Sequence, residues 1–168
     1  MKFLTRWAVM AGACLLAASA IAQPMTVADV KYEETASVNG STLQLNGAGV
    51  RYKAVFKVYT AGLYLEKKAG TPADVMALKG PKRMSVTMLR EIGSTELGKL
   101  FSRRMEDNMD RAAFSRLIPG VMRMSQIFSD HKKLVAGDQF QIDWIPGTGT
   151  VITVKGKRLI EECPVVLY

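Results

Sequence analysis

Few side chains in this sequence have the types and spacing that catalysis or metal binding requires. The single histidine, His131, lies in the polar stretch 129–133 and has no cysteine or histidine partner at metal-ligand spacing. Cys163 is the one cysteine outside the N-terminal apolar run, so we expect neither an internal disulfide nor a cysteine-based zinc site. Its thiol either fills a small apolar space or links two chains. We therefore predict no metal, no cofactor and no catalytic histidine.

Asn108 is a polar residue within an apolar pattern. Residues 94–109 predict a helix that Ser94 or Thr95 caps, and its apolar side chains recur at helical spacing on one face. That face contains Leu97, Leu100, Phe101, Met105 and Met109. Asn108 falls on the same face, and a buried amide without partners costs about 1–3 kcal/mol. Asn108 is therefore predicted to be either a satisfied core asparagine or a ligand contact.

Arg51 lies in the stretch 43–66, which is rich in β-branched, aromatic and aliphatic residues and predicts strands. We expect a tight turn at Asn46-Gly47 and a bulge or a bend at Gly62, with Arg51 just past the turn. If no bulge intervenes, Arg51 and Tyr59 share a strand face. That face would also carry lysines, so a solvated strand arginine remains an alternative to a functional one.

The other elements alternate between strands and helices. Thr71 and Pro72 predict the start of a short helix that ends near residue 80, and residues 82–89 predict a strand. Pro119 is expected to begin a further helix, with a shared face of Val121, Met122, Ser125 and Phe128. Residues 139–144 alternate, which predicts a strand with one buried face, and strands at 150–154 and 158–160 follow. This order predicts an α+β fold, an antiparallel sheet with helices on one face.

The N-terminus has the features of a secretory signal. A basic start precedes the apolar run 7–20, and residues 20–22 fit the cleavage rule, so residues 1–22 are the predicted signal peptide. Lipidation at Cys14 and an uncleaved anchor are the alternatives. Residues 23–168 are then one domain, expected to be soluble, exported, periplasmic in a Gram-negative cell, and without a stable membrane span.

The way in which the basic residues are distributed does not indicate a nucleic-acid partner. Removing Lys2 and Arg6 lowers the formal net charge from +8 to +6, and the remaining basic residues are scattered in pairs along the chain. Such pairs are usually solvated faces. Weak attraction to anionic lipid surfaces fits an exported basic protein better.

Two strings resemble the chalcone isomerase-like family. They are LNGAGVR at residues 45–51 and YTAGLYLE at residues 59–66. Plant chalcone isomerases carry a similar Gly-Ala-Gly-x-Arg run and a similar Gly-x-Tyr-Leu-Glu run. The family contains flavonoid enzymes, non-catalytic fatty-acid-binding relatives and exported bacterial members. The resemblance implies a large antiparallel sheet under a helical layer, with an apolar ligand cleft between them.

The resemblance also implies a site. Arg51 matches the arginine implicated in closing the flavanone ring in the plant enzymes, where it would be catalytic. Tyr59 occupies the place of their ketone-polarising threonine, and Thr60 would face the other side of a regular strand. Phe101 and Asn108 match the spacing of a helical tyrosine and asparagine. Because the expected hydroxyls are missing, these departures weaken the case for an isomerase.

Fatty-acid-binding relatives hold a carboxylate with an arginine and a tyrosine on these strands, which Arg51 and Tyr59 match. We therefore expect a non-catalytic exported protein that binds a small apolar carboxylate through Arg51, Tyr59, Phe101 and Asn108. The alternatives are a chalcone isomerase-type intramolecular lyase and a structural or partner-binding domain.

Family members usually end in a terminal helix, whereas residues 163–168 are too short for one and contain Pro164. We expect that helix to be missing. One wall of the cleft is then absent, replaced by this tail, or supplied by a partner chain. The last alternative predicts a homodimer.

Overall fold

The computed structural model describes residues 24–129 and 133–158. Their largest element is a seven-stranded sheet in the order β11-β10-β9-β6-β5-β4-β3, with every neighbouring pair antiparallel. Its strands are β3 (Thr35–Val38), β4 (Ser41–Lys53), β5 (Phe56–Leu65), β6 (Lys82–Met88), β9 (Gln139–Ile145), β10 (Gly149–Val154) and β11 (Lys157–Arg158). Two small two-stranded antiparallel sheets accompany it, β1 (Met25–Val27) with β2 (Val30–Tyr32), and β7 (Ile92–Gly93) with β8 (Lys133–Leu134).

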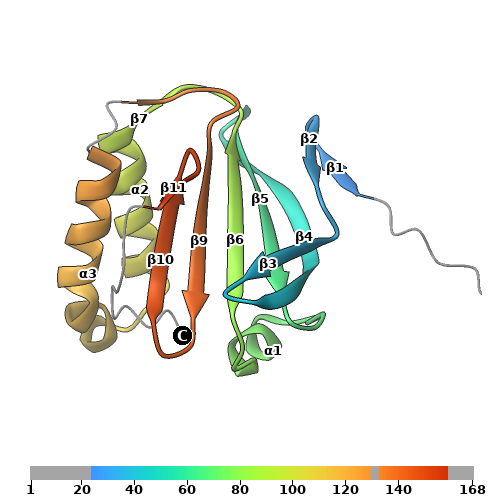
Figure 1. Cartoon of the computed structure of the whole chain (residues 1–168). Helices are drawn as coiled ribbons and strands as arrows, with labels where there is room; N and C mark the ends of the chain where they lie inside the picture. The colour runs from blue at the N-terminus through green and yellow to red at the C-terminus, as the bar shows by residue number, and fades with distance from the viewer. Residues whose placement is uncertain (1–23, 130–132, 159–168) are drawn as a thin grey trace, which may run out of the picture.

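The two longer helices form a layer on one side of the sheet. They are α2 (Ser94–Asp107) and α3 (Arg111–Ser129), which lie side by side, while β1 and β2 lie at the opposite side (Figure 1). The short helix α1 (Pro72–Ala77) sits at one end of the sheet. The predicted α+β fold is therefore confirmed. Within the described residues, no helix has the length and apolarity needed to cross a membrane.

The core has two parts, one on each face of the sheet. The part under the helices includes Val86, Met88, Leu97, Phe140 and Ile142. The other includes Tyr32, Leu43, Leu45, Tyr64 and Ile145, where the N-terminal strands cover the sheet. Apolar side chains therefore point both ways from the central strands.

The second core part corrects the expectation that residues 139–144 bury one face only. Asp143 is buried although it belongs to the predicted polar face. Its carboxylate accepts two hydrogen bonds from Arg83, each at 2.6 Å. A buried carboxylate needs such a partner, because an unpaired buried charge is strongly destabilising.

The predicted turn at Asn46-Gly47 was wrong, because β4 runs through it. The pairing with β5 shifts by one residue between Leu45 and Gly47, so Asn46 forms a bulge. Its side-chain amide bonds both backbone groups of Ala69, at 3.1 Å and 2.7 Å. These bonds to a distant loop replace those of a turn. The β4–β5 turn instead lies at residues 54–55, where Ala54 has a φ of 52°.

Gly62 is neither a bulge nor a bend but a point of close approach inside β5. A Cβ at this position would lie 2.6 Å from the Cδ1 atom of the Tyr32 ring. The glycine therefore lets the Tyr32 ring approach closely the face of the sheet opposite the helices.

The helix ends show which local signals acted. Thr71 caps α1 as predicted, and its hydroxyl accepts from the Asp74 N–H at 3.1 Å while Asp74 accepts from Thr71. The prediction that Pro119 begins a helix was wrong. The helix α3 begins eight residues earlier, where Asp110 accepts from the Ala113 N–H at 2.8 Å, and Pro119 lies inside it.

The predicted face of α3 is confirmed at Val121 but not at Met122. Met122 is 68 % exposed, whereas Val121 and Met124 are buried. The predictions for the signal peptide, Cys14, His131, Cys163, strand residues 159–160 and the chain end lie outside the described residues.

Candidate functional site

A cleft of about 330 Å³ lies between α2 and the face of the sheet that carries the helices. Its sheet wall is formed by Val86, Phe140 and Ile142, and its helix wall by Leu97, Leu100 and Phe101. Its polar lining residues are Arg51, Lys53, Tyr59 and Arg104. Mostly apolar walls with a few polar groups are typical of sites for small molecules.

The hairpin of β4 and β5 places Arg51 beside Tyr59. The two residues are direct cross-strand partners, so their side chains leave the same face of the sheet. A bulge does occur between Arg51 and Tyr52, but it lies beyond this pair, toward the turn. Val58 is the extra residue, and both Val58 and Tyr59 line the cleft. Lys57 pairs with Tyr52 and does not line it.

Arg51 is an exposed cation without a partner among the residues that the structure describes. Within residues 24–129 and 133–158, neither its guanidinium nor the Tyr59 hydroxyl makes a hydrogen bond or an ion pair. The other two cations of the cleft differ in this respect. The Lys53 ammonium lies 2.9 Å from the Glu96 carboxylate, and Arg104 lies 3.4 Å from Asp107. Arg51 can therefore accept an anionic ligand without breaking an existing pair.

The ion pair of Lys53 and Glu96 joins the hairpin to the start of α2. The hydrogen bond from Lys53, followed by its charge, lowers the pKa of the Glu96 carboxyl. Both side chains are more than half exposed, so the pair is expected to contribute little to stability. It joins the two elements at Lys53, which lines the cleft.

The structure brings three of the four predicted ligand-binding residues to this cleft. Arg51, Tyr59 and Phe101 line it, but Asn108 does not. Asn108 is exposed at the C-terminal cap of α2, and its Nδ2 donates to the Arg104 carbonyl at 2.7 Å. The prediction of a buried amide was wrong, because α2 ends at Asp107 and Asn108 is its C-terminal cap, where the side chain is exposed.

Thr60 lies on the opposite face from the cleft. Its side chain is fully buried and accepts a hydrogen bond from the Tyr32 hydroxyl at 2.7 Å. Burial raises the pKa of Tyr32, and the hydrogen bonds with Thr60 and Thr87 lower it by a smaller amount. Among the described residues that line the cleft, Tyr59 alone carries a hydroxyl.

Arg104 is a lining residue that the sequence analysis did not select. It follows Phe101 by three positions on α2, a spacing that places two side chains on one helix face. That spacing was a usable signal once Phe101 was chosen. In the described part of the chain, no three acidic, histidine or cysteine side chains gather as a metal site would require.

Comparison with known proteins assigns this architecture. The profile described as chalcone isomerase-like matches residues 24–164. The chain belongs to the chalcone isomerase-like family. A crystal structure of an Arabidopsis thaliana fatty-acid-binding protein has the same fold, with a TM-score of 0.65, 15% sequence identity, and coverage of 81% of this chain and 79% of that one. No curated protein matches the sequence significantly.

Membership in the chalcone isomerase-like family agrees with the elements that form the cleft. Of the strings that carried the resemblance, residues 45–51 lie in β4 and residues 59–65 lie in β5, its paired neighbour. The family contains both isomerases and non-catalytic fatty-acid binders, so membership supports a binding role without deciding for or against catalysis.

Proposed function

We propose that this protein is an exported, non-catalytic binding protein for a small apolar carboxylate such as a fatty acid. The observation that carries the proposal is the Arg51 guanidinium beside Tyr59, without an internal partner in the described residues, at an apolar cleft. The similarity in fold to a fatty-acid-binding protein supports the same class of ligand.

The chemistry of the cleft suits a carboxylate. A guanidinium binds a carboxylate with two parallel hydrogen bonds, and the Tyr59 hydroxyl can donate a third. Leu97, Leu100 and Phe101 offer an apolar surface for the ligand's tail. The volume of about 330 Å³ is near the lower end for ligand pockets, which run from about 300 to 1,000 Å³. A single acyl chain therefore fits better than a bulkier lipid.

An isomerase remains the alternative within the family. Arg51 would then stabilise a developing oxyanion, for which its permanent charge is suited. The position of Thr60 on the far face of β5 weighs against this chemistry, because its hydroxyl is bound to Tyr32 and cannot reach the cleft. Export rests on the predicted signal at residues 1–22.

The test measures binding of a long-chain fatty acid by calorimetry and by native mass spectrometry. Arg51→Ala is expected to weaken binding about 10- to 100-fold, because a hydrogen bond to a charged group contributes about 1.5–3 kcal/mol. Tyr59→Phe should weaken it less. Arg103→Ala is the matched control, because this exposed arginine of α2 lines a groove outside the cleft.

Unchanged affinity in Arg51→Ala, or no fatty-acid binding by the wild-type protein, would overturn the proposal. A turnover assay with a chalcone completes the test. Turnover that disappears in Arg51→Ala would assign the cleft to an isomerase instead.

A further inference from the structure

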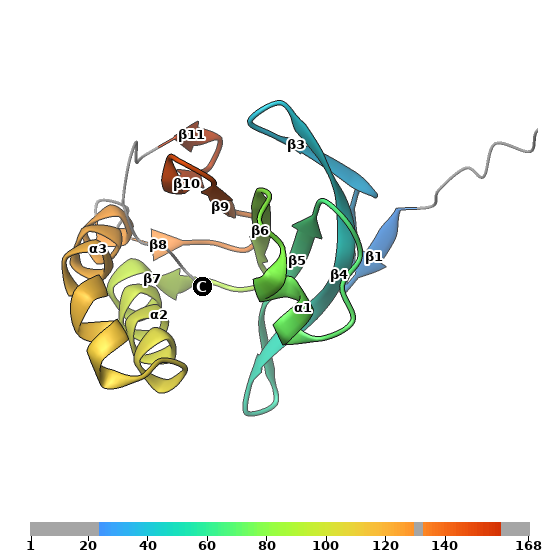
Figure 2. The same cartoon turned by 90° about the horizontal axis from the view of Figure 1, so that it is seen from below.

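The tip of the β4–β5 hairpin, residues 52–57, extends beyond the rest of the sheet. The last pair that joins β5 to β6 is Tyr59 with Met88, and β3 pairs with β4 only at Ser41–Gln44. No strand therefore flanks the tip on either side within the described residues. Figure 2 shows the hairpin projecting away from the sheet.

This tip carries three exposed apolar side chains. Val55 is 82 % exposed, Phe56 57 % and Tyr52 49 %. Hairpin turns favour glycine and asparagine, which supply the backbone twist at little cost. Here Ala54 adopts the left-handed conformation and Val55 follows it at the turn. Clustered exposed apolar side chains of this kind commonly mark an interaction site.

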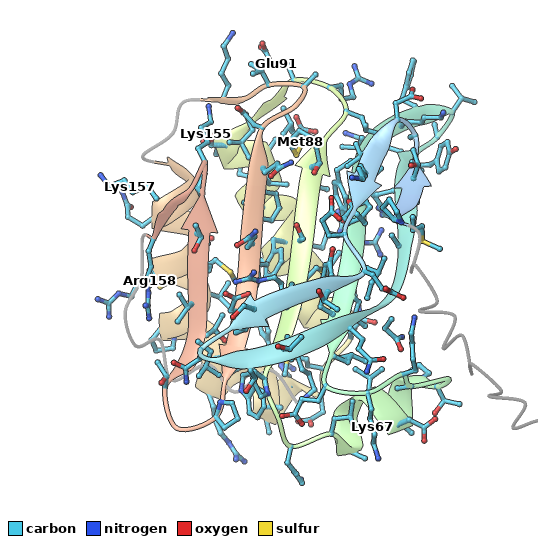
Figure 3. All side chains as sticks on the ribbon, turned by 45° about the vertical axis from the view of Figure 1, so that its right-hand side comes forward. Lys67, Met88, Glu91, Lys155, Lys157 and Arg158 are labelled. Atoms are coloured by element: carbon cyan, nitrogen blue, oxygen red, sulfur yellow. The ribbon has the colours of Figure 1, made fainter. Side chains whose placement is uncertain are left out.

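Basic groups surround the apolar tip. Arg51, Lys53 and Lys57 are exposed on the same hairpin. The Arg90 guanidinium lies 5.0 Å from the centre of the Phe56 ring. One of these cations is paired with an acidic side chain, because the Lys53 ammonium lies 2.9 Å from the Glu96 carboxylate. Other basic residues lie elsewhere, Lys67 beside α1 and Lys157 and Arg158 at the β11 edge (Figure 3).

We propose that the hairpin tip docks on a bilayer that contains anionic phospholipids. Aromatic side chains are enriched at the membrane–water interface, and basic residues next to it are attracted to anionic headgroups. In this arrangement Tyr52, Val55 and Phe56 enter the interface, and the four cations contact the headgroups. A narrow protruding tip suits the soft surface of a bilayer, whereas a protein partner would require a matching pocket.

Docking would bring the cleft to the lipid surface. Arg51 and Lys53 belong to the hairpin and also line the cleft. A carboxylate leaving the bilayer would thus meet Arg51 first. This last step rests on the proposed function, whereas membrane docking does not.

Vesicle sedimentation tests the docking. The protein is expressed from the full chain, and its N-terminus is determined by mass spectrometry so that all variants are compared with the same leader state. We expect binding to vesicles with about one-third phosphatidylglycerol, and at least about tenfold weaker binding to pure phosphatidylcholine. Val55→Asp should lower binding to the anionic vesicles about tenfold or more. Met122→Asp is the control, because it places the same charge on α3 at a side chain that is also well exposed.

Insertion of the tip itself is read from fluorescence. A tryptophan at this position, Val55→Trp, should shift its emission to shorter wavelength with anionic vesicles and not with phosphatidylcholine alone. Equal binding by Val55→Asp and wild type, equal binding to both vesicle types, or no emission shift would overturn the proposal. Val55→Asp should keep its fatty-acid affinity in solution, so failure of docking and failure of the proposed ligand are distinguishable.

Discussion

Two arginines on opposite faces of the sheet differ in what surrounds them. Arg83 is largely buried and donates two hydrogen bonds to Asp143, which raises the pKa of its guanidinium. Its charge is therefore already paired within the folded protein and is not available to a ligand. Arg51 is exposed, and its guanidinium makes no hydrogen bond or ion pair with the described residues. Replacing Arg51 should therefore change ligand binding with little effect on folding, which makes it a suitable position for testing function.

Gly62 supports a prediction about stability at a single residue. Gly62→Ala adds a methyl group 2.6 Å from the Tyr32 ring, inside a packed core. Overpacking of this kind typically costs about 1–3 kcal/mol, so the free energy of unfolding should fall by that amount in urea titrations.

Gly49→Ala is the matched control for Gly62→Ala. Gly49 lies on the neighbouring strand, where an added Cβ meets no atom within 4 Å. It should leave the stability unchanged or raise it slightly by restricting the unfolded chain. A Gly62→Ala protein as stable as Gly49→Ala would show that the Tyr32 ring can move aside.

At the scale of elements, the β4–β5 hairpin has three parts along its length that differ in what they contact. Near its base the Asn46 bulge bonds a loop, in its middle Arg51 and Tyr59 face the cleft, and its tip projects into solvent. The two bulges separate these parts, because each changes the register by one residue. The long strands thus place a binding pair and an apolar tip close together.

The proline inside α3 predicts a gain in stability. Pro119 has no N–H to donate to the Ser115 carbonyl, and proline is about 3 kcal/mol less favourable than alanine inside a helix. Pro119→Ala should raise the free energy of unfolding by about 2 kcal/mol. The gain in the folded helix is reduced by about 0.4–1 kcal/mol, because alanine makes the unfolded chain more flexible. Urea unfolding measures the change.

The neighbouring exposed residue Arg116 provides the control, because Arg116→Ala should alter stability only slightly. A loss of stability in Pro119→Ala would indicate that the packing of α3 depends on the shape that the proline imposes.

At the scale of the whole molecule, a polar network on the second face ties the N-terminal strands to the central sheet. Tyr32 bonds Thr60, and the Tyr64 hydroxyl donates to the Glu33 carbonyl at 3.0 Å. Burial is the largest cause that raises the pKa of each tyrosine. The folded protein therefore keeps both phenol protons at a pH where the unfolded chain loses them.

This difference predicts a loss of stability at alkaline pH. Each tyrosine's contribution is complete below about pH 10, the ordinary tyrosine pKa, and is lost as the pH rises through the higher pKa of the folded state. Burial lowers the pKa of the Lys82 amine. This shift makes the stability rise with pH in the range just below the usual lysine pKa, which opposes the effect of the tyrosines. Urea unfolding between about pH 8 and about pH 11 should show the decline.

Tyr32→Phe isolates one contribution, because Lys82 is the same in both proteins. The variant should be about 1 kcal/mol less stable than wild type near pH 8, through loss of the hydrogen bond to Thr60. This difference should shrink as the pH rises. Tyr52→Phe, whose ring is half exposed at the hairpin tip, is the matched control. Parallel stability curves for wild type and Tyr32→Phe would contradict the assignment.

The sequence by itself determined the features that depend on near neighbours. These include the Thr71 cap, the apolar face of α2 and the family strings that contain Arg51 and Tyr59. Capping and helical periodicity act within a few residues, so the sequence displays them directly. The family strings coincide with β4 and β5, whose pairing sets Arg51 beside Tyr59.

Only the tertiary structure decided the features that depend on distant contacts. Asn46 forms a bulge because its amide bonds Ala69, and Asp143 is buried because Arg83, 60 residues away in sequence, pairs with it. Asn108 is exposed because α2 ends before it. Burial on two faces arises from strands brought together by folding, and no local pattern records which distant residue will cover a given side chain.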